Sequence, residues 1–323
     1  MGRTDSVAIT ANGVSKQFEG AVGLDRVDLE VPTGTVTSLL GPNGAGKTTM
    51  VRILSTLLRP DSGMIRVAGH DVLREPERVR ALIGLTGQSV AVDAKLSGPE
   101  NLRMFGRLNR LSWPVVRERS APLLETFELD RAGKRAVKTY SGGMRRKLDL
   151  ALSLMAQPRI LFLDEPTTGL DPASRHALWD VIGSLVRQGS TVMLTTQYLD
   201  EADALADSIV FLDGGRVIAT GTPAELKARA ASTQLVLTMA SEPDAVRLTT
   251  GLEGFHAVAD HRTVRIAVPA NGGDGLNELR AVLDAALRTD VDVESYTVRE
   301  PDLDDVYFHL TGHARPVEMK DAA

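Results

Sequence analysis

The chain has 323 residues, of which 43% are hydrophobic, and this length predicts about two domains of ~150 residues each. The formal net charge is −5, and the 37 basic residues are scattered among 42 acidic ones, so the sequence lacks the basic stripe of a nucleic-acid-binding protein. Because the chain has no cysteine, a disulfide scaffold and a zinc site built on thiolates are both excluded.

Residues 7–40 alternate apolar and polar positions, which is typical of strands. Between the apolar run at 36–40 and a helical pattern that starts at Thr49, the chain reads Gly41-Pro42-Asn43-Gly44-Ala45-Gly46-Lys47-Thr48. This is the strand–GxxxxGK[ST]–helix order of a phosphate-binding loop. A glycine-rich turn that binds nothing would not require Lys-Thr at its end. We therefore predict that the chain binds a nucleoside triphosphate.

The predicted loop carries the groups that a triphosphate needs. Its glycines let the backbone wrap around the phosphates, and the helix N-terminus aims N–H groups and a positive dipole end at the anion. Lys47 supplies a charge for the β- and γ-phosphates, and the Thr48 hydroxyl supplies a ligand for Mg²⁺. The predicted nucleotide-binding residues here are Gly41, Asn43, Gly44, Gly46, Lys47, Thr48 and Thr49.

From residue 98 to 138 the apolar spacing predicts a helical insertion. After it, Ser141-Gly142-Gly143 opens a helix that runs to Gln157 and is stopped by Pro158. The serine hydroxyl, N–H groups and helix dipole would form a second anion site, although Ser-Gly-Gly is also a frequent helix cap. One chain has no obvious use for two phosphate sites, whereas two chains packed head-to-tail could each close the other's nucleotide.

The apolar run 160–163 predicts a buried strand that ends in Asp164 and Glu165. Asp164 at the strand tip can hold Mg²⁺ in its second shell, and Glu165 can polarise a water molecule for attack on the γ-phosphate. The alternative is a pair of acids that only cap a core strand. The phosphate loop expected on the same sheet favours the catalytic interpretation.

The remainder of the first 230 residues alternates strands with helices, which predicts an α/β core with a parallel sheet. The pattern places helices at 175–188 and 199–206, and strands at 191–194, 209–212 and 216–219. Near residues 230–232 the character changes, and the order becomes β-α-β-β-α-β plus a final helix. We therefore predict two domains, 1–230 and 231–323, the second a small α+β domain of ferredoxin-like order.

Over residues 7–230 the chain resembles the nucleotide-binding subunit of an ATP-binding-cassette (ABC) transporter. It is most similar to the daunorubicin/doxorubicin-resistance type of multidrug and lipid exporter ATPase, and residues 297–307 also resemble the tail of that subgroup. The resemblance implies a P-loop NTPase fold, with a RecA-like core and a helical subdomain at about residues 95–157. It also implies that the bound nucleotide is ATP with Mg²⁺.

The resemblance assigns three further roles. Phe18 matches the aromatic residue that stacks on adenine, although a ring at a strand edge could equally be a core residue. Gln88 matches the glutamine that touches Mg²⁺ and the attacking water and contacts the membrane subunit; alone it would be a solvated loop residue. Asp171 matches the aspartate that reports to the opposite nucleotide site, although its surroundings could be a simple turn.

Two positions depart from the family pattern. Met144 stands where many members have glutamine, next to the predicted anion site Ser141, Gly142 and Gly143. Gln197 stands where the family usually has a histidine that contacts the γ-phosphate. Glutamine can donate an amide N–H but cannot ionise. The subgroup shares this glutamine, so we interpret Gln197 as a variant of the switch residue.

The resemblance implies an ATPase that dimerises around two ATP–Mg²⁺ and powers efflux of drug-like or lipid substrates. No stretch approaches the ~20 apolar residues of a membrane span, so a separate membrane-spanning permease is expected to recruit the chain to the cytoplasmic face of the cell membrane. The rival functions are an ABC protein acting on DNA or ribosomes and a nucleotide-gated regulator. A single cassette without cysteines opposes the first, and Glu165 opposes the second; we expect no nucleic-acid partner.

Overall fold

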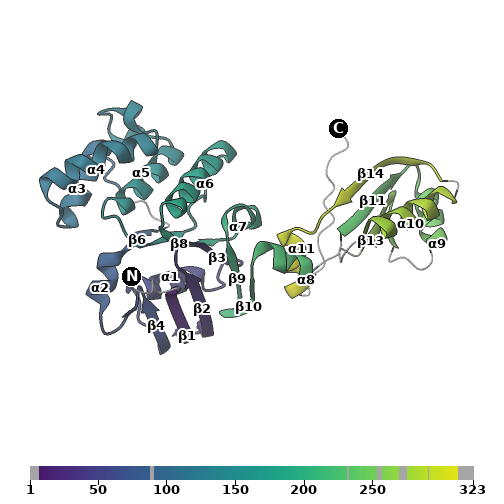
Figure 1. The fold of residues 1–323 in the computed structure, drawn as a ribbon, viewed down its shortest axis with the longest axis horizontal. Coiled ribbons are helices and arrows are strands. Elements are labelled where there is room, and N and C mark those ends of the chain that lie inside the picture. Colours follow the sequence, from purple (N-terminus) through teal and green to yellow (C-terminus); the bar gives the residue numbers. More distant parts are fainter. Residues whose placement is uncertain are drawn as a thin grey trace. The chain divides into compact units, whose positions relative to one another are not determined.

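The computed structural model describes residues 7–87, 91–230, 233–252, 257–268, 275–289 and 291–311. The chain divides into two compact units, residues 1–223 and 224–323, and each unit is described by itself (Figure 1). Helix α8 (Pro223–Ala230) falls with the second unit, although the sequence predicts it as the end of the first domain. Of the helices in the described part of the chain, none is long and apolar enough to cross a membrane.

An antiparallel sheet of four strands begins the first unit. Strands β1 and β2 form a hairpin, and β4 pairs with the other edge of β1, which gives the order β2-β1-β4-β5. The bounds are β1 (Val7–Phe18), β2 (Ala21–Pro32), β4 (Ser62–Val67) and β5 (His70–Asp71). The structure thus confirms the strand-like pattern of residues 7–40.

A second sheet of six strands carries the candidate site, in the order β10-β9-β3-β8-β7-β6. Only β10 runs antiparallel to its neighbour, and the other pairs are parallel, as the α/β pattern predicts. The carboxyl ends of the parallel strands therefore meet at one edge. The bounds are β3 (Val36–Leu40), β6 (Ile83–Thr86), β7 (Ile160–Asp164), β8 (Thr191–Thr196), β9 (Ser208–Asp213) and β10 (Arg216–Gly221).

This parallel sheet separates two hydrophobic cores. In β7, Ile160 and Phe162 join the core under the antiparallel sheet and α1 (Lys47–Leu54), whereas Leu161 and Leu163 join the core under the helices. The alternation follows from the two-residue period of a strand. Figure 1 shows α3, α4, α5 and α6 above the sheet and α1 with β1, β2 and β4 below it. Each strand of the site is thus packed on both faces.

The helical insertion is present as expected and contains α3 and α4. A capping box starts α3, because Ser97 accepts from the Glu100 backbone N–H and the Glu100 carboxylate accepts from the Ser97 N–H. The helices of the first unit are α2 (Pro76–Leu82), α3 (Gly98–Leu108), α4 (Trp113–Thr126), α5 (Gly142–Leu154), α6 (Pro172–Arg187) and α7 (Leu199–Leu205), with 3₁₀ turns at 130–132 and 137–139.

The second unit has the β-α-β-β-α-β succession expected from the sequence. Its antiparallel sheet has the order β12-β13-β11-β14, and its core joins apolar residues of β11 and β13 to α9 and α10. The bounds are β11 (Thr233–Met239), α9 (Glu242–Gly251), β12 (Ala257–Asp260), β13 (Thr263–Val268), α10 (Gly275–Leu287), β14 (Val293–Arg299) and α11 (Leu303–Thr311).

Candidate active site

The glycine-rich loop joins the end of β3 to the start of α1. Gly44 and Gly46 have φ angles of 83° and 107°, in the left-handed region that favours glycine. A Cβ atom on Gly46 would also lie 2.4 Å from the carbonyl oxygen of Gly23. Gly46 caps α1 without a side chain, so a phosphate group can accept hydrogen bonds from the first turn of the helix.

Lys47 is buried at the start of α1, with only 4% of its side chain exposed. Its Nζ donates hydrogen bonds to the carbonyl oxygens of Gly41 at 2.7 Å and Pro42 at 3.0 Å, and lies 3.7 Å from Oε1 of Glu165. Burial lowers the pKa of Lys47, and the carboxylates of Glu165 and Asp164 oppose that shift. The ammonium group is thus held in the loop, where an anionic phosphate can pair with it.

Asp164 joins the tip of β7 to both the phosphate loop and β8. Its Oδ1 accepts hydrogen bonds from the Thr48 hydroxyl at 3.1 Å and from the Thr195 hydroxyl at 2.6 Å. A threonine hydroxyl and a carboxylate are oxygen ligands of the kind that Mg²⁺ prefers alongside phosphate and water. The residues present therefore fit an Mg²⁺ ion that arrives with a nucleotide.

Glu165 follows directly and has a φ of 51°, which is uncommon for a residue with a side chain. Its backbone N–H lies 3.1 Å from both the carbonyl and the hydroxyl oxygen of Thr195, and the Thr168 hydroxyl donates to its Oε2 at 3.3 Å. The carboxylate borders a pocket of about 360 Å³, so a water molecule can reach it. The other residues around this pocket are Gly142, Arg145, Arg146, Thr168, Gly169 and Leu170.

Arg146 belongs to this site, although the sequence analysis does not single it out. Its guanidinium is buried and donates hydrogen bonds to four backbone carbonyl oxygens, those of Gly87, Asp164, Glu165 and Pro166. In the sequence it is the middle of three consecutive basic residues, which normally indicates a solvated helix face. The local signal for burial of the Arg146 charge is Asp149, three residues later on the same face of α5.

The predicted second anion site is the start of α5, beside the start of α6. Ser141 caps α5 by accepting a hydrogen bond from the Met144 N–H at 3.2 Å. Asp171 caps α6 by accepting from the Ser174 N–H at 2.9 Å and hydroxyl at 2.6 Å, and this bonding lowers its pKa. A Cβ on Gly143 would lie 2.9 Å from the Ser174 hydroxyl, so the two helix starts are adjacent. Ser141, Gly142 and Asp171 are exposed.

Phe18 lies at the turn between β1 and β2, and 47% of it is exposed, which excludes the alternative of a core residue. Its ring packs on Gly23, because a Cβ there would lie 2.6 Å from a ring carbon. Gly23 in turn lies beside the phosphate loop, because a Cβ on Gly46 would lie 2.4 Å from the Gly23 oxygen. The exposed ring also has the Lys16 ammonium 5.9 Å from its centroid.

Gln197 follows the last residue of β8 and is half-buried at the same sheet edge as Asp164. The next residue, Tyr198, lies under the guanidinium of Arg175 on α6, with 4.8 Å between that group and the ring centroid. The loop that carries Gln197 is thus attached to α6. Gln88, the other predicted glutamine, lies outside the described residues.

Comparisons with known proteins agree with this geometry. The profile of the ABC transporter family matches residues 24–168. The chain is 49% identical to the daunorubicin resistance ATP-binding protein DrrA3 of Streptomyces coeruleorubidus, over 98% of this chain and 99% of the relative. The chain belongs to the ABC transporter family. It is also 48% identical to the doxorubicin resistance ATP-binding protein DrrA of Mycobacterium tuberculosis, over 96% of this chain and 95% of that protein.

A solved structure of the ATP-binding subunit of an ABC transporter matches with a TM-score of 0.62 and 29% identity. It covers 69% of this chain and 92% of that chain, whereas the match to DrrA3 covers nearly the whole length. The similarity to the drug-resistance branch of the ABC family therefore extends through the second unit as well as the cassette.

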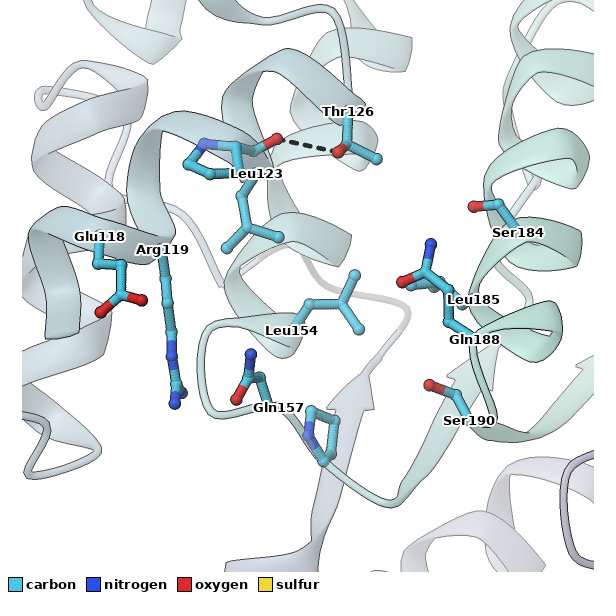
Figure 2. Close-up of a pocket in the computed structure, with 12 residues that line it drawn as sticks. Glu118, Arg119, Leu123, Thr126, Leu154, Gln157, Ser184, Leu185, Gln188 and Ser190 are labelled. Carbon is cyan, nitrogen blue, oxygen red and sulfur yellow. Dashed lines mark hydrogen bonds between the residues drawn. The ribbon is translucent and has the colours of Figure 1, made fainter.

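A second cavity of the cassette, of about 420 Å³, lies between α4 and the C-terminal ends of α5 and α6 (Figure 2). Arg119, Leu154 and Gln188 are among the residues around it. None of the residues predicted to bind the nucleotide or the metal lines this cavity. Ser141 and Asp171, for example, lie at the opposite ends of α5 and α6. This cavity provides control positions for experiments on the site.

Proposed function

We propose that the chain hydrolyses ATP to power export of drug-like or lipid substrates through a separate membrane-spanning permease. The observation that carries the proposal is the convergence of the phosphate loop on the acid pair, with Thr48 bonded to Asp164 and Lys47 3.7 Å from Glu165. A loop that cradles phosphates beside a metal-associated acid and a candidate base has the parts of a phosphoryl-transfer site. The names of the drug-resistance relatives support the substrate class.

In this proposal each group has one task. The loop backbone and Lys47 bind the β- and γ-phosphates, and Phe18 stacks on adenine. Thr48 and Asp164, with Gln88, hold Mg²⁺, which neutralises phosphate charge when bound. Glu165 accepts a proton from the attacking water, and Gln197 donates a hydrogen bond to the γ-phosphate. Asn43, Thr49 and the glycines 41, 44 and 46 complete the nucleotide contacts.

The exposed starts of α5 and α6 support a dimer of two copies. Ser141, Gly142 and Gly143 present a helix N-terminus, which favours an anion. In a head-to-tail pair, this terminus would contact the γ-phosphate held by the partner's loop, and Asp171 would lie beside it. Two ATP–Mg²⁺ would then be enclosed between the copies. The permease would hold the pair at the cytoplasmic face of the membrane.

The Glu165→Gln variant tests the hydrolytic step. The amide keeps the size of the side chain but removes its basicity, so turnover should fall by about 10²–10⁴-fold while ATP still binds. ATPase rates and calorimetric titration with ATP measure the two effects. Glu118→Gln, at the cavity of Figure 2, is the matched control and should retain wild-type turnover. Near wild-type turnover in Glu165→Gln would contradict the proposed base.

Export is tested separately, in cells that produce the chain together with its membrane subunit. Accumulated daunorubicin should be lower with the wild-type chain than with Glu165→Gln. Equal accumulation, despite measurable ATPase activity of the wild type, would contradict this substrate class and leave the ATPase assignment intact.

A further inference from the structure

Arg146 forms an unusual contact with the turn that carries Glu165. Its Nε donates to the Pro166 oxygen at 2.8 Å, and its Nη2 donates to the oxygens of Asp164 at 3.1 Å and Glu165 at 2.9 Å. Three successive carbonyl groups therefore point at one guanidinium. The remaining terminal nitrogen, Nη1, donates to the Gly87 oxygen at 2.6 Å.

A guanidinium is costly to bury, and Arg146 as a whole is only 7% exposed. Burial lowers the pKa of Arg146, while nearby carboxylates, that of Asp149 first among them, oppose the shift. Oδ2 of Asp149 lies 3.8 Å from Nη1, and its Oδ1 accepts a hydrogen bond from the Ala91 N–H at 2.8 Å. The charge is thus compensated within α5, and its donors remain directed at the turn.

The turn needs such support because Glu165 has a positive φ of 51°. A residue with a Cβ is strained in this conformation and keeps it only where surrounding contacts impose it. On one side of the turn, Arg146 binds the three carbonyl oxygens of residues 164 to 166. On the other side, the Glu165 N–H donates to Thr195. Together they set the direction of the Glu165 side chain.

We propose that Arg146 is a positioning residue for ATP hydrolysis, which holds the Glu165 carboxylate in its working orientation through the backbone. The inference rests on the proposed ATPase function. Arg146 also joins α5, which Ser141 caps, to Gly87, the neighbour of Gln88. Its contacts are with the catalytic turn and not with Lys47, so its loss should lower kcat and leave the KM for ATP nearly unchanged.

Arg146→Lys separates geometry from charge. A lysine keeps the positive charge but has one nitrogen, which cannot span the four carbonyl oxygens as the planar guanidinium does. We expect kcat to fall by about 10–100-fold, up to the scale for a reacting group displaced by about 1 Å, with KM close to wild type and the protein still folded at the assay temperature. Arg119→Gln is the control, because Arg119 also donates to a backbone carbonyl, that of Met155 at 2.9 Å, beside the cavity in Figure 2.

A double variant identifies the residue through which Arg146 acts. If its role is to orient Glu165, then adding Arg146→Lys to Glu165→Gln should cause no further loss of kcat, because the base is already absent. A further loss of tenfold would overturn the proposal. It would also be overturned if Arg146→Lys had wild-type kcat, or lost ATP binding and melting temperature together. A wild-type protein without Glu165-dependent ATPase activity would instead contradict the proposed function itself.

Discussion

The indole Nε1 of Trp179 donates a hydrogen bond of 3.1 Å to Oε1 of Glu201, a residue that solvent does not reach. Trp179 lies on α6 and Glu201 on α7, immediately after the loop that carries Gln197. Burial raises the pKa of Glu201, although the polar side chains of Thr196, Thr167 and Trp179 beside it oppose the shift. The loop that carries Gln197 is therefore attached to α6 by a carboxyl group whose charge is costly to bury.

The pH dependence of stability should report this group. Between the ordinary pKa of 4.5 and the raised folded value, folded protein keeps a proton that unfolded chain has lost, so Glu201 makes stability fall as pH rises through that window. Glu201→Gln removes this contribution. Its free energy of unfolding relative to wild type should therefore increase from pH 4.5 upward and then level off. Chemical denaturation at several pH values measures it, with exposed Glu118→Gln as control; a difference independent of pH would contradict the prediction.

Gln197 should control turnover without a pH transition of its own. Removing a hydrogen-bond donor to a transition state typically costs about 10²–10³-fold in rate, so Gln197→Ala should lose most ATPase activity. Gln197→His should stay active and gain a new limb near pH 6–7. The measurement is ATPase rate against pH for the three proteins with the membrane partner present. Wild-type rates in Gln197→Ala would mean that this side chain does not act on the γ-phosphate.

The head-to-tail dimer predicts complementation between two inactive chains. Lys47→Ala removes the buried charge from the phosphate loop, and Ser141→Arg blocks the start of α5. In a mixed dimer, one composite site contains both defects and the other contains neither. Verified heterodimers should recover part of the ATPase activity that each homodimer lacks. Mixtures of Lys47→Ala with wild-type chain, at equal concentration, show how far one inactive chain alone lowers the rate of a mixed dimer. Absence of recovered activity in the verified heterodimers would contradict the head-to-tail dimer.

The second unit should be separable from the cassette. Its core of β11, β13, α9 and α10 is a cluster distinct from the two cores around the six-stranded sheet. A chain ending at Ala230 should therefore remain folded and bind ATP, while its assembly with a second copy or with the permease should weaken. Calorimetric titration and co-purification measure the two properties. An insoluble truncated chain would show that the second unit completes the fold.

The sequence predicted the elements whose signals are local. Each of these signals appears within a few residues of sequence. They are the apolar run before Asp164, the glycine-rich motif before Lys47 and the strand and helix periods of the second domain. Strand β6 was not predicted, because Ile83-Gly84-Leu85-Thr86 is short and contains a glycine. Gly84 is required by tertiary packing, since a Cβ there would lie 2.9 Å from both Leu161 and Pro158.

Arg146 illustrates a second limit of reasoning from sequence. Arg145, Arg146 and Lys147 have the same charge and follow one another, yet of the three only Arg146 is fully buried. Its four hydrogen-bond acceptors are backbone carbonyl groups. Every residue has such a group, so the sequence does not indicate which of them bind Arg146. The start of α5 at Ser141 could be predicted from cap chemistry, whereas the side chain that connects this helix to Glu165 required coordinates.

The alternation of β7 between two cores has a consequence for how the site tolerates mutation. A slip of one residue in the strand's pairing would exchange Ile160 and Phe162 with Leu161 and Leu163, and would move Asp164 by about 3.3 Å along the strand. That shift exceeds the whole 3.1 Å separation between Asp164 and the Thr48 hydroxyl. The apolar side chains of β7 thus fix the position of Asp164 and Glu165 along the strand. Enlarging one of these side chains should lower turnover at temperatures where the protein is still fully folded.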